Sequence, residues 1–309
     1  FAPLRLASKE KILENLRRLS RQTGYEEISL LSLSSSDHPD ICGLVDGIMT
    51  EFKGRGVSVS LPSLRARHLV GGLSQMLSTM RKTTLTFAPE AGTQRLRSVI
   101  RKDLDVEELF GVAADAFRAG YRFLKLYFMI GLPTEEEEDL RGIEELCRRL
   151  IFLKKGIDGR PAQLTVSISN FVPKPHTPFQ WQAMATVEEI RSKQEYLKKA
   201  FGNLKGRAKL RFHNPEMSYM ESLFSRGDRR LSSVILGAYQ RGARFDAWEE
   251  GFQFGLWQEA FDQSGLDPVQ YLRARSMSES LPWDFIDVGV AMDYLRQEAC
   301  LALEGCKKH

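Results

Sequence analysis

Short apolar runs rich in β-branched residues alternate with amphipathic stretches over the first two thirds of the chain. The apolar runs predict strands within 26–37, 57–61, 83–87, 122–133, 164–171 and 209–214. The amphipathic stretches predict helices over 41–56, 69–80, 105–120, 135–155 and 187–201. A further helix begins after the N-cap Ser8, runs to about Arg21 and is stopped by Gly24. Strands that alternate with helices in this way are typical of parallel βα units.

The predicted strands end in polar, glycine or proline residues, and the C-terminal ends of parallel strands hold the ligand site in barrels and open sheets alike. Neither Gly-x-Gly-x-x-Gly nor a phosphate-loop motif follows the first strand, so a nucleotide-binding open sheet lacks its main support. We therefore expect an α/β fold, a partial TIM-type (βα)6 barrel. The strand pattern stops near Asn214, which predicts a core over residues 1–213 and an α-rich C-terminal extension over 214–309.

Composition and charge narrow the class of protein. With 309 residues, 42% of them hydrophobic, the chain can bury a full core, and its net charge of +4 is only mildly basic. The basic clusters are more typical of solvated helix faces than of a nucleic-acid footprint. No apolar run approaches the ~20 residues of a membrane span, and four scattered cysteines form no disulfide framework, so we expect a cytoplasmic protein. The chain begins at Phe1, and we interpret it as a fragment.

The first candidate site is the segment FAPEAGTQRLR, residues 87–97, at the end of a strand. Glu90 could accept hydrogen bonds from an ammonium group, and Arg95 and Lys102 could pair with a carboxylate. Thr93 stands where the next helix begins, and such a turn offers backbone N–H groups to an anion. An ordinary capping turn with a surface ion pair accounts for the same residues equally well.

The second candidate is MIGLPTEEEEDL, in which Gly131 and Pro133 follow a buried strand. Glycine permits a close backbone approach, and Thr134 and Glu137 have the spacing of a capping box. Helix initiation alone explains this segment, and the acidic run is then a solvated face.

The third candidate is ISNFVPKPHTPFQW, where three prolines fix an extended course after a strand. Phe171 and Val172 could offer backbone groups and an apolar surface to a flat ring. His176 is more typical of an ordinary loop histidine than of a catalytic one.

Polar residues also gather after two earlier strands. Ser34 and Ser35 follow one strand, and Ser63 and Arg65 follow the next. Small donors and acceptors at adjacent strand ends suit a zwitterionic ligand that carries a ribose. Solvated loops explain them equally well.

The segments LSLSSSD, SLPSLR, LTFAPEAGTQRLR, KLYFMIGLPTE and SNFVPKPHTPFQW occur in this order. Together they resemble a family of radical S-adenosylmethionine (SAM) proteins that often carry a cobalamin-binding domain upstream. The stretch LPWDFIDVGV resembles the segment that follows the core of that family. The resemblance implies a [4Fe–4S] cluster on a Cys-x3-Cys-x2-Cys loop and an enzyme that forms a 5′-deoxyadenosyl radical from SAM.

The resemblance also implies which residues bind SAM. Ser34 and Ser35 match positions near the methionine amino group, and Ser63 and Arg65 lie beside them. Contacts with the methionine carboxylate, ribose and adenine match Glu90, Thr93, Arg95, Gly131, Pro133, Phe171 and Val172.

The sequence departs from the family at the cluster, because it contains no Cys-x3-Cys-x2-Cys. In the family that loop lies just before the segment that matches FAPLRL. We therefore expect the first barrel strand and the cluster ligands to lie upstream of this chain, and we expect the chain itself to be inactive. Cys42 and Cys147 occupy apolar helical positions and are expected in the core. Cys300 and Cys306 are more typical of structural or surface cysteines than of a second metal site.

Two other functions remain open. An aldolase-like barrel would need a Schiff-base lysine, for which Lys125 is the candidate, and a phosphate-binding strand end that is not evident. An RNA-binding module would use the basic helices, although the sequence lacks a known aromatic and basic motif. The resemblance does not name the substrate, and RNA as a target is not indicated.

Overall fold

The structure is a computed structural model that describes residues 6–30, 38–52, 55, 58–60 and 84–304. Of the predicted site, Ser34, Ser35, Ser63 and Arg65 lie outside the described residues, as does the helix expected over 69–80.

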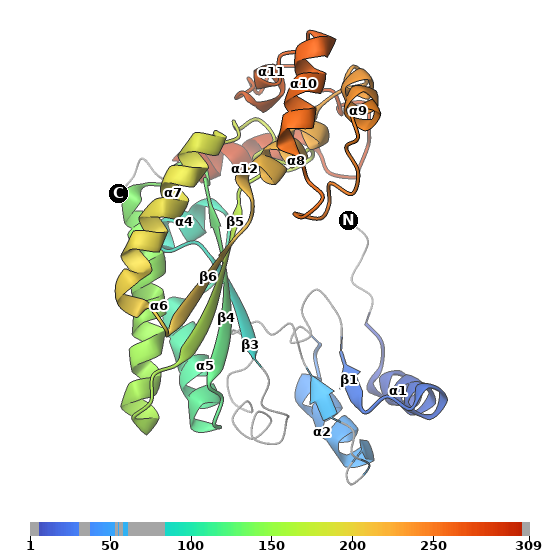
Figure 1. Cartoon of the computed structure of the whole chain (residues 1–309). Coiled ribbons are helices and arrows are strands. Elements are labelled where there is room, and N and C mark those ends of the chain that lie inside the picture. Colours follow the sequence, from blue (N-terminus) through green and yellow to red (C-terminus); the bar gives the residue numbers. More distant parts are fainter. Residues whose placement is uncertain (1–5, 31–37, 53–54, 56–57, 61–83, 305–309) are drawn as a thin grey trace.

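A four-stranded parallel sheet forms the centre of the chain (Figure 1). It consists of β3 (Leu85–Glu90), β4 (Phe123–Ile130), β5 (Gln163–Asn170) and β6 (Ala208–Phe212), and these strands are neighbours in chain order. The pairing of β4 with β5 is regular from Phe123↔Gln163 to Ile130↔Asn170. The carboxyl ends of these strands therefore meet at one edge of the sheet.

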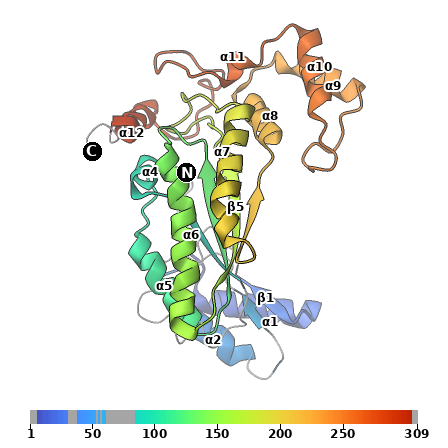
Figure 2. The same ribbon diagram turned by 60° about the vertical axis from the view of Figure 1, so that its left-hand side comes forward.

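Helices cover one face of this sheet (Figures 1 and 2). The covering helices are α5 (Val106–Arg118), α6 (Glu137–Asp158) and α7 (Val187–Ala200), and each follows a strand. Their apolar side chains pack on alternate strand residues, so that Leu124, Leu126 and Phe128 of β4 are fully buried. The residues between them, Lys125 and Tyr127, lie on the other face, which is partly exposed.

The first part of the chain forms a smaller βα unit. It contains α1 (Lys9–Thr23), β1 (Glu27–Ser29), α2 (Ile41–Phe52) and β2 (Ser58–Ser60), and β1 pairs with β2 in parallel. The predicted ends of α1 are confirmed, because the Ser8 hydroxyl accepts a hydrogen bond from the Lys11 amide and Gly24 adopts a left-handed φ of 70°. Most of the first predicted strand, over 31–37, lies outside the described residues.

The fold is therefore mixed α/β, as expected, but a barrel is not shown. Doubly wound sheets reverse their strand order and carry helices on both faces. Consecutive strand order with helices on one face is instead the arrangement of a barrel wall. In the described residues, however, β1–β2 and β3–β6 are two separate sheets.

Beyond β6 the described residues form helices and loops. These helices are α8 (Pro215–Arg226), α9 (Leu231–Gln240), α10 (Phe254–Ser264), α11 (Val269–Leu272) and α12 (Met292–Glu304). The first four share a separate apolar core that includes Leu223, Val234 and Trp257. In contrast, α12 returns to the main body and packs against α4 (Gln94–Val99). Among the described helices, none has the length and apolar character needed to cross a membrane.

Candidate functional site

The end of β3 turns sharply at Glu90. This residue has a left-handed φ of 66°, which is rare for a residue other than glycine. The pairing of β3 with β4 is irregular between Phe87 and Glu90. The Glu90 carboxylate is about one quarter exposed and lies 3.3 Å from the Lys102 ammonium group. Lys102 therefore pairs within the turn, and Glu90 keeps part of its carboxylate open to solvent or a ligand.

Thr93 and Arg95 are joined to the beginning of α6 by the buried carboxylate of Asp139. Asp139 accepts hydrogen bonds from the Thr93 hydroxyl and the Arg95 guanidinium, and from the Glu136 amide at 2.8 Å. Arg95 also donates to the Thr134 carbonyl at 2.8 Å. Thr93 additionally caps α4 by accepting from the Leu96 amide. The polar groups of Thr93 and Arg95 are therefore hydrogen-bonded to other residues of the chain.

Gly92 allows this turn to lie directly on α6. A Cβ atom at Gly92 would lie 2.5 Å from the Ile143 amide nitrogen and 2.8 Å from the Gly142 carbonyl carbon, and closer still to the Asp139 carbonyl oxygen. All of these are backbone atoms that cannot rotate away. The glycine is therefore required by helix packing, independently of any ligand.

The end of β4 also has a left-handed turn, at Gly131, whose φ is 78°. The Gly131 amide donates to the Glu135 carboxylate at 2.9 Å, and the Lys193 ammonium group of α7 lies 2.5 Å from the same carboxylate. Pro133 is partly buried in the same turn. Burial raises the pKa of Glu135, although its bonds to Lys193 oppose this shift.

The predicted capping box at this turn was wrong by two residues. The pair is Glu136 and Asp139, not Thr134 and Glu137. Thr134 has a φ of 63°, which is incompatible with the extended conformation of an N-cap residue.

The ring of Phe171, after β5, is buried in an apolar cluster. It lies edge-on to Phe179 with the ring centroids 5.7 Å apart, and it packs with Ala91 and Leu132 from the other two strand ends. Val172 is partly buried against the core of the C-terminal helices. The Phe171 ring therefore lies buried beneath the three strand ends.

The structure brings the described part of the predicted site together at the carboxyl edge of the sheet. Glu90 pairs with Phe128, two residues before Ile130, and Gly131 follows Ile130 directly. The Phe171 amide donates to the Ile130 carbonyl at 2.8 Å. The turns after β3, β4 and β5 are therefore neighbours.

Sequence reasoning missed two carboxylates. Glu135 belongs to the acidic run 135–138 that was interpreted as a solvated face, and Asp139 follows that run directly, yet each side chain is only 2% exposed. Their partners are distant in sequence, so local spacing could not have found them. The one available signal was the position of Asp139 directly before the apolar Leu140.

The described residues do not fit an iron–sulfur cluster. No group of three or more His, Cys, Asp or Glu side chains within the described ranges is arranged to hold a metal ion. Cys147 is fully buried, as predicted, and burial raises the pKa of its thiol well above the usual range. Cys300 is partly buried, and its sulfur lies 4.0 Å from the sulfur of Met277.

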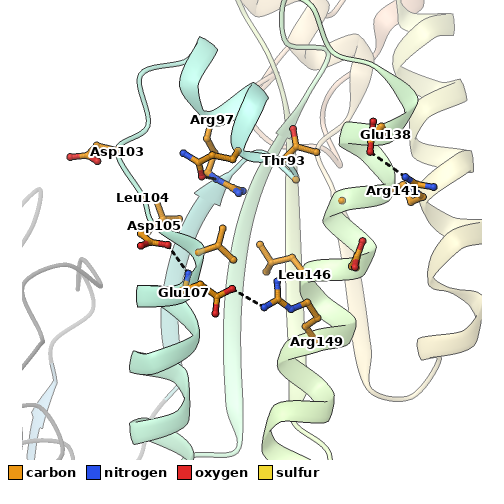
Figure 3. Close-up of a pocket in the computed structure, with 15 residues that line it drawn as sticks. Thr93, Arg97, Asp103, Leu104, Asp105, Glu107, Glu138, Arg141, Leu146 and Arg149 are labelled. Carbon is orange, nitrogen blue, oxygen red and sulfur yellow. Dashed lines mark hydrogen bonds and ion pairs between the residues drawn. The ribbon is translucent and has the colours of Figure 1, made fainter. Parts of the chain in front are cut away.

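A cavity of about 640 Å³ lies between α4, the loop before α5, and α6 (Figure 3). Of the predicted site residues that are described, Thr93 alone lines it. Two of its ion pairs, Glu107 with Arg149 and Glu138 with Arg141, neutralise much of its charge. It lies among the helices, and we do not assign a ligand to it.

Comparison with known proteins does not give a function. No protein-family model matches the chain. The uncharacterized protein MJ0966 of Methanocaldococcus jannaschii is 32% identical over 216 residues, which are 68% of this chain and 43% of that protein. The chain thus spans less than half the length of this relative. The structure of SuiB from Streptococcus suis covers 70% of this chain and 46% of its own, with a TM-score of 0.45 and 12% identity. A likeness this weak carries no argument about fold or function.

Proposed function

We propose that the strand-end edge of this chain binds SAM and that the chain is the core of a radical SAM enzyme. The observation that carries the proposal is the meeting of three turns. Glu90, Gly131 and Phe171 come from the three sequence segments that resemble the family, and they lie together at the carboxyl edge of adjacent parallel strands. Ligands of parallel α/β folds bind at this edge.

In the proposed site, the Glu90 carboxylate accepts hydrogen bonds from SAM, either from its ribose hydroxyls or from its ammonium group. The left-handed turn at Glu90 presents the carboxylate, and Lys102 holds it in place from one side. The segments Gly131–Pro133 and Phe171–Val172 provide backbone groups and apolar surface for the adenine. Thr93 and Arg95 support the site indirectly, because their hydrogen bonds to Asp139 fix the turn that carries Glu90. The proposed site also includes four residues that lie outside the described ranges, namely Ser34, Ser35, Ser63 and Arg65.

SAM would supply an adenosyl radical only when a reduced cluster cleaves it, and the described residues provide no cluster site. We propose that the thiolates lie outside this sequence, which contains no Cys-x3-Cys-x2-Cys. Within the chain, residues 1–213 form the SAM-binding core and 214–309 an extension. The part that these residues play is to bind and orient SAM.

The test is SAM binding by this chain, measured by saturation-transfer difference NMR at millimolar SAM. We expect a saturable signal on the adenine protons that ATP does not displace. Glu90→Gln should weaken binding by about tenfold or more, because a hydrogen bond to a charged group contributes roughly 1.5–3 kcal/mol. The matched control is Glu188→Gln, which removes an exposed carboxylate from α7. If SAM does not bind, or if both variants behave alike, the proposed site is wrong.

A further inference from the structure

A second cavity, of about 860 Å³, lies beyond the sheet where three segments meet. One wall contains His176, from the loop after β5, and another contains Ser225, Asp228 and Arg229, from the end of α8 and the turn after it. The third wall is the loop that contains Trp283 and Phe285. Because α8 follows β6 and the His176 loop follows β5, the cavity belongs to the carboxyl-end side of the sheet, where parallel α/β proteins bind ligands.

The fully buried amide of Gln180 joins two of these walls. Its side-chain oxygen accepts hydrogen bonds from the His176 backbone amide at 3.0 Å and from the Trp283 indole N–H at 2.7 Å. His176 has a left-handed φ of 55°, a strained conformation that surrounding contacts must maintain. The loop is therefore held in a fixed shape at the cavity wall.

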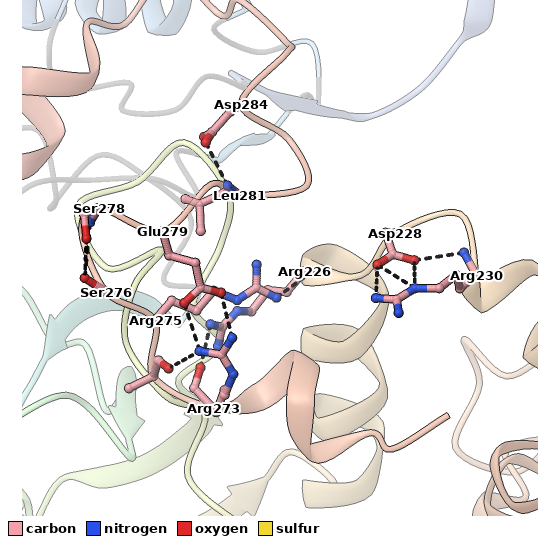
Figure 4. Close-up of polar contacts among 11 residues, drawn as sticks. Arg226, Asp228, Arg230, Arg273, Arg275, Ser276, Ser278, Glu279, Leu281 and Asp284 are labelled. Atoms are coloured by element: carbon pink, nitrogen blue, oxygen red, sulfur yellow. Dashed lines mark hydrogen bonds and ion pairs between the residues drawn. The ribbon is translucent and has the colours of Figure 1, made fainter. Parts of the chain in front are cut away.

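Two buried arginines, Arg226 at the end of α8 and Arg275, join α8 to the segments that surround the cavity (Figure 4). Arg226 donates to the Gln182 carbonyl at 2.8 Å and to the Arg273 carbonyl at 2.9 Å. Arg275 donates to the Arg226 carbonyl at 3.1 Å, and its guanidinium lies 5.0 Å from the centre of the Trp283 ring. Burial lowers the pKa of Arg226 to about 10, so it remains a cation at neutral pH. These contacts preorganise the cavity before any ligand binds.

Among the described residues that line the cavity, the charge that remains is positive. Asp228 is neutralised by Arg230, whose guanidinium binds both carboxylate oxygens, at 2.7 to 3.2 Å (Figure 4). Arg229 is exposed and has no ion-pair partner among the described residues. The His176 ring, likewise, has no hydrogen-bond partner within the described ranges. Both side chains are available to an anionic group.

The wall formed by the loop after Trp283 is apolar, and its side chains are exposed to solvent. Phe285 is 85% exposed, and Ile286 and Val288 are each at least 40% exposed, although all three line the cavity. Contiguous exposed apolar side chains rimmed by polar residues are typical of ligand or interaction sites. The volume is also within the range of small-molecule sites.

We propose that this cavity binds an organic anion with an apolar body, whose carboxylate or phosphate is held by Arg229 and whose apolar part covers Phe285, Ile286 and Val288. None of the predicted SAM-binding residues that the structure describes lines this cavity. The proposal therefore does not depend on SAM binding.

The experiment compares two fluorinated probes by ¹⁹F NMR titration of the full chain, namely 6-fluoro-2-naphthoate and its neutral amide. The carboxylate should bind about fivefold more tightly than the amide, as expected for one partly exposed ion pair. Arg229→Gln should abolish this preference while leaving amide binding unchanged. The control is Arg207→Gln, another exposed arginine, which should preserve the preference.

Ile286→Asp should weaken both probes, because it removes part of the apolar wall. The proposal is overturned if neither probe saturates, if the wild-type protein binds both equally, or if Arg229→Gln retains the preference. Since Arg229 has no ion-pair partner in the described part of the chain, its replacement should leave the urea midpoint unchanged. SAM binding is measured on the same sample. A protein that binds SAM but not the probes contradicts the proposed anion site alone, whereas one that binds the probes but not SAM contradicts the proposed function alone.

Discussion

Gly92→Ala is the substitution for which the structure makes the most definite prediction. The new methyl group would lie 2.5 Å from the Ile143 amide nitrogen, whereas real Cβ atoms essentially never approach a neighbour within 3.0 Å. The obstacle is the backbone of α6, so the helix or the β3 turn must move. Overpacking of this kind costs about 1–3 kcal/mol, and a rigid backbone neighbour places this case at the upper end.

The movement would also disturb Asp139, whose carboxylate binds Thr93 and Arg95. We therefore expect a loss of about 3 kcal/mol in the free energy of unfolding. With a urea m-value of roughly 3 kcal/mol/M, the midpoint would fall by about 1 M. Far-UV circular dichroism during urea titration measures this midpoint.

Gly156→Ala is the matched control. Gly156 lies on the exposed side of α6, and an added Cβ there would meet nothing within 4 Å. Alanine is favoured over glycine in a helix interior by about 0.5–1 kcal/mol, so this variant should be more stable than wild type. An unchanged midpoint for Gly92→Ala, or equal damage from both substitutions, would refute the packing argument.

Three further predictions concern buried polar groups. Asp139→Asn removes the charge that pairs with the partly exposed Arg95, and we expect a loss of about 2 kcal/mol in urea unfolding, with wild-type stability as the contradicting result. Burial raises the pKa of Glu135, so its contribution is full below the ordinary carboxyl pKa and is lost as pH rises through the raised value. Glu135→Gln should therefore gain stability relative to wild type between pH 4 and pH 7, and the opposite slope would show that the Lys193 pair dominates. Gln180→Leu leaves the Trp283 indole N–H without its acceptor and should cost about 2 kcal/mol, with wild-type stability as the contradicting result.

Periodicity in the sequence was sufficient to predict most of the helices and strands that the structure describes. The helix expected over 135–155 is α6, Glu137–Asp158, and the strand expected over 122–133 is β4, Phe123–Ile130. The boundaries differ because caps and turns set them. The β4 strand stops at Gly131, whose left-handed φ breaks the ladder, and the expected box at Thr134 is replaced by one at Glu136.

The site was less predictable because its polar groups are paired over long distances in the chain. Arg95 was expected to face a ligand carboxylate, but the guanidinium binds Asp139, 44 residues away. Glu135 was assigned to solvent, but it binds Lys193, 58 residues away. Only tertiary packing determines such partners, so an acidic run looks the same in sequence whether its members are solvated or buried.

The formation of 5′-deoxyadenosine from SAM tests the central claim most directly. The product of the complete gene would be reconstituted anaerobically with iron and sulfide, reduced with dithionite and assayed by chromatography, with this chain under identical conditions as the control. We predict 5′-deoxyadenosine from the complete product, its loss on Glu90→Gln, and none from this chain. A complete product that forms a cluster and binds SAM but releases no 5′-deoxyadenosine would contradict the assignment, as would release by this chain alone.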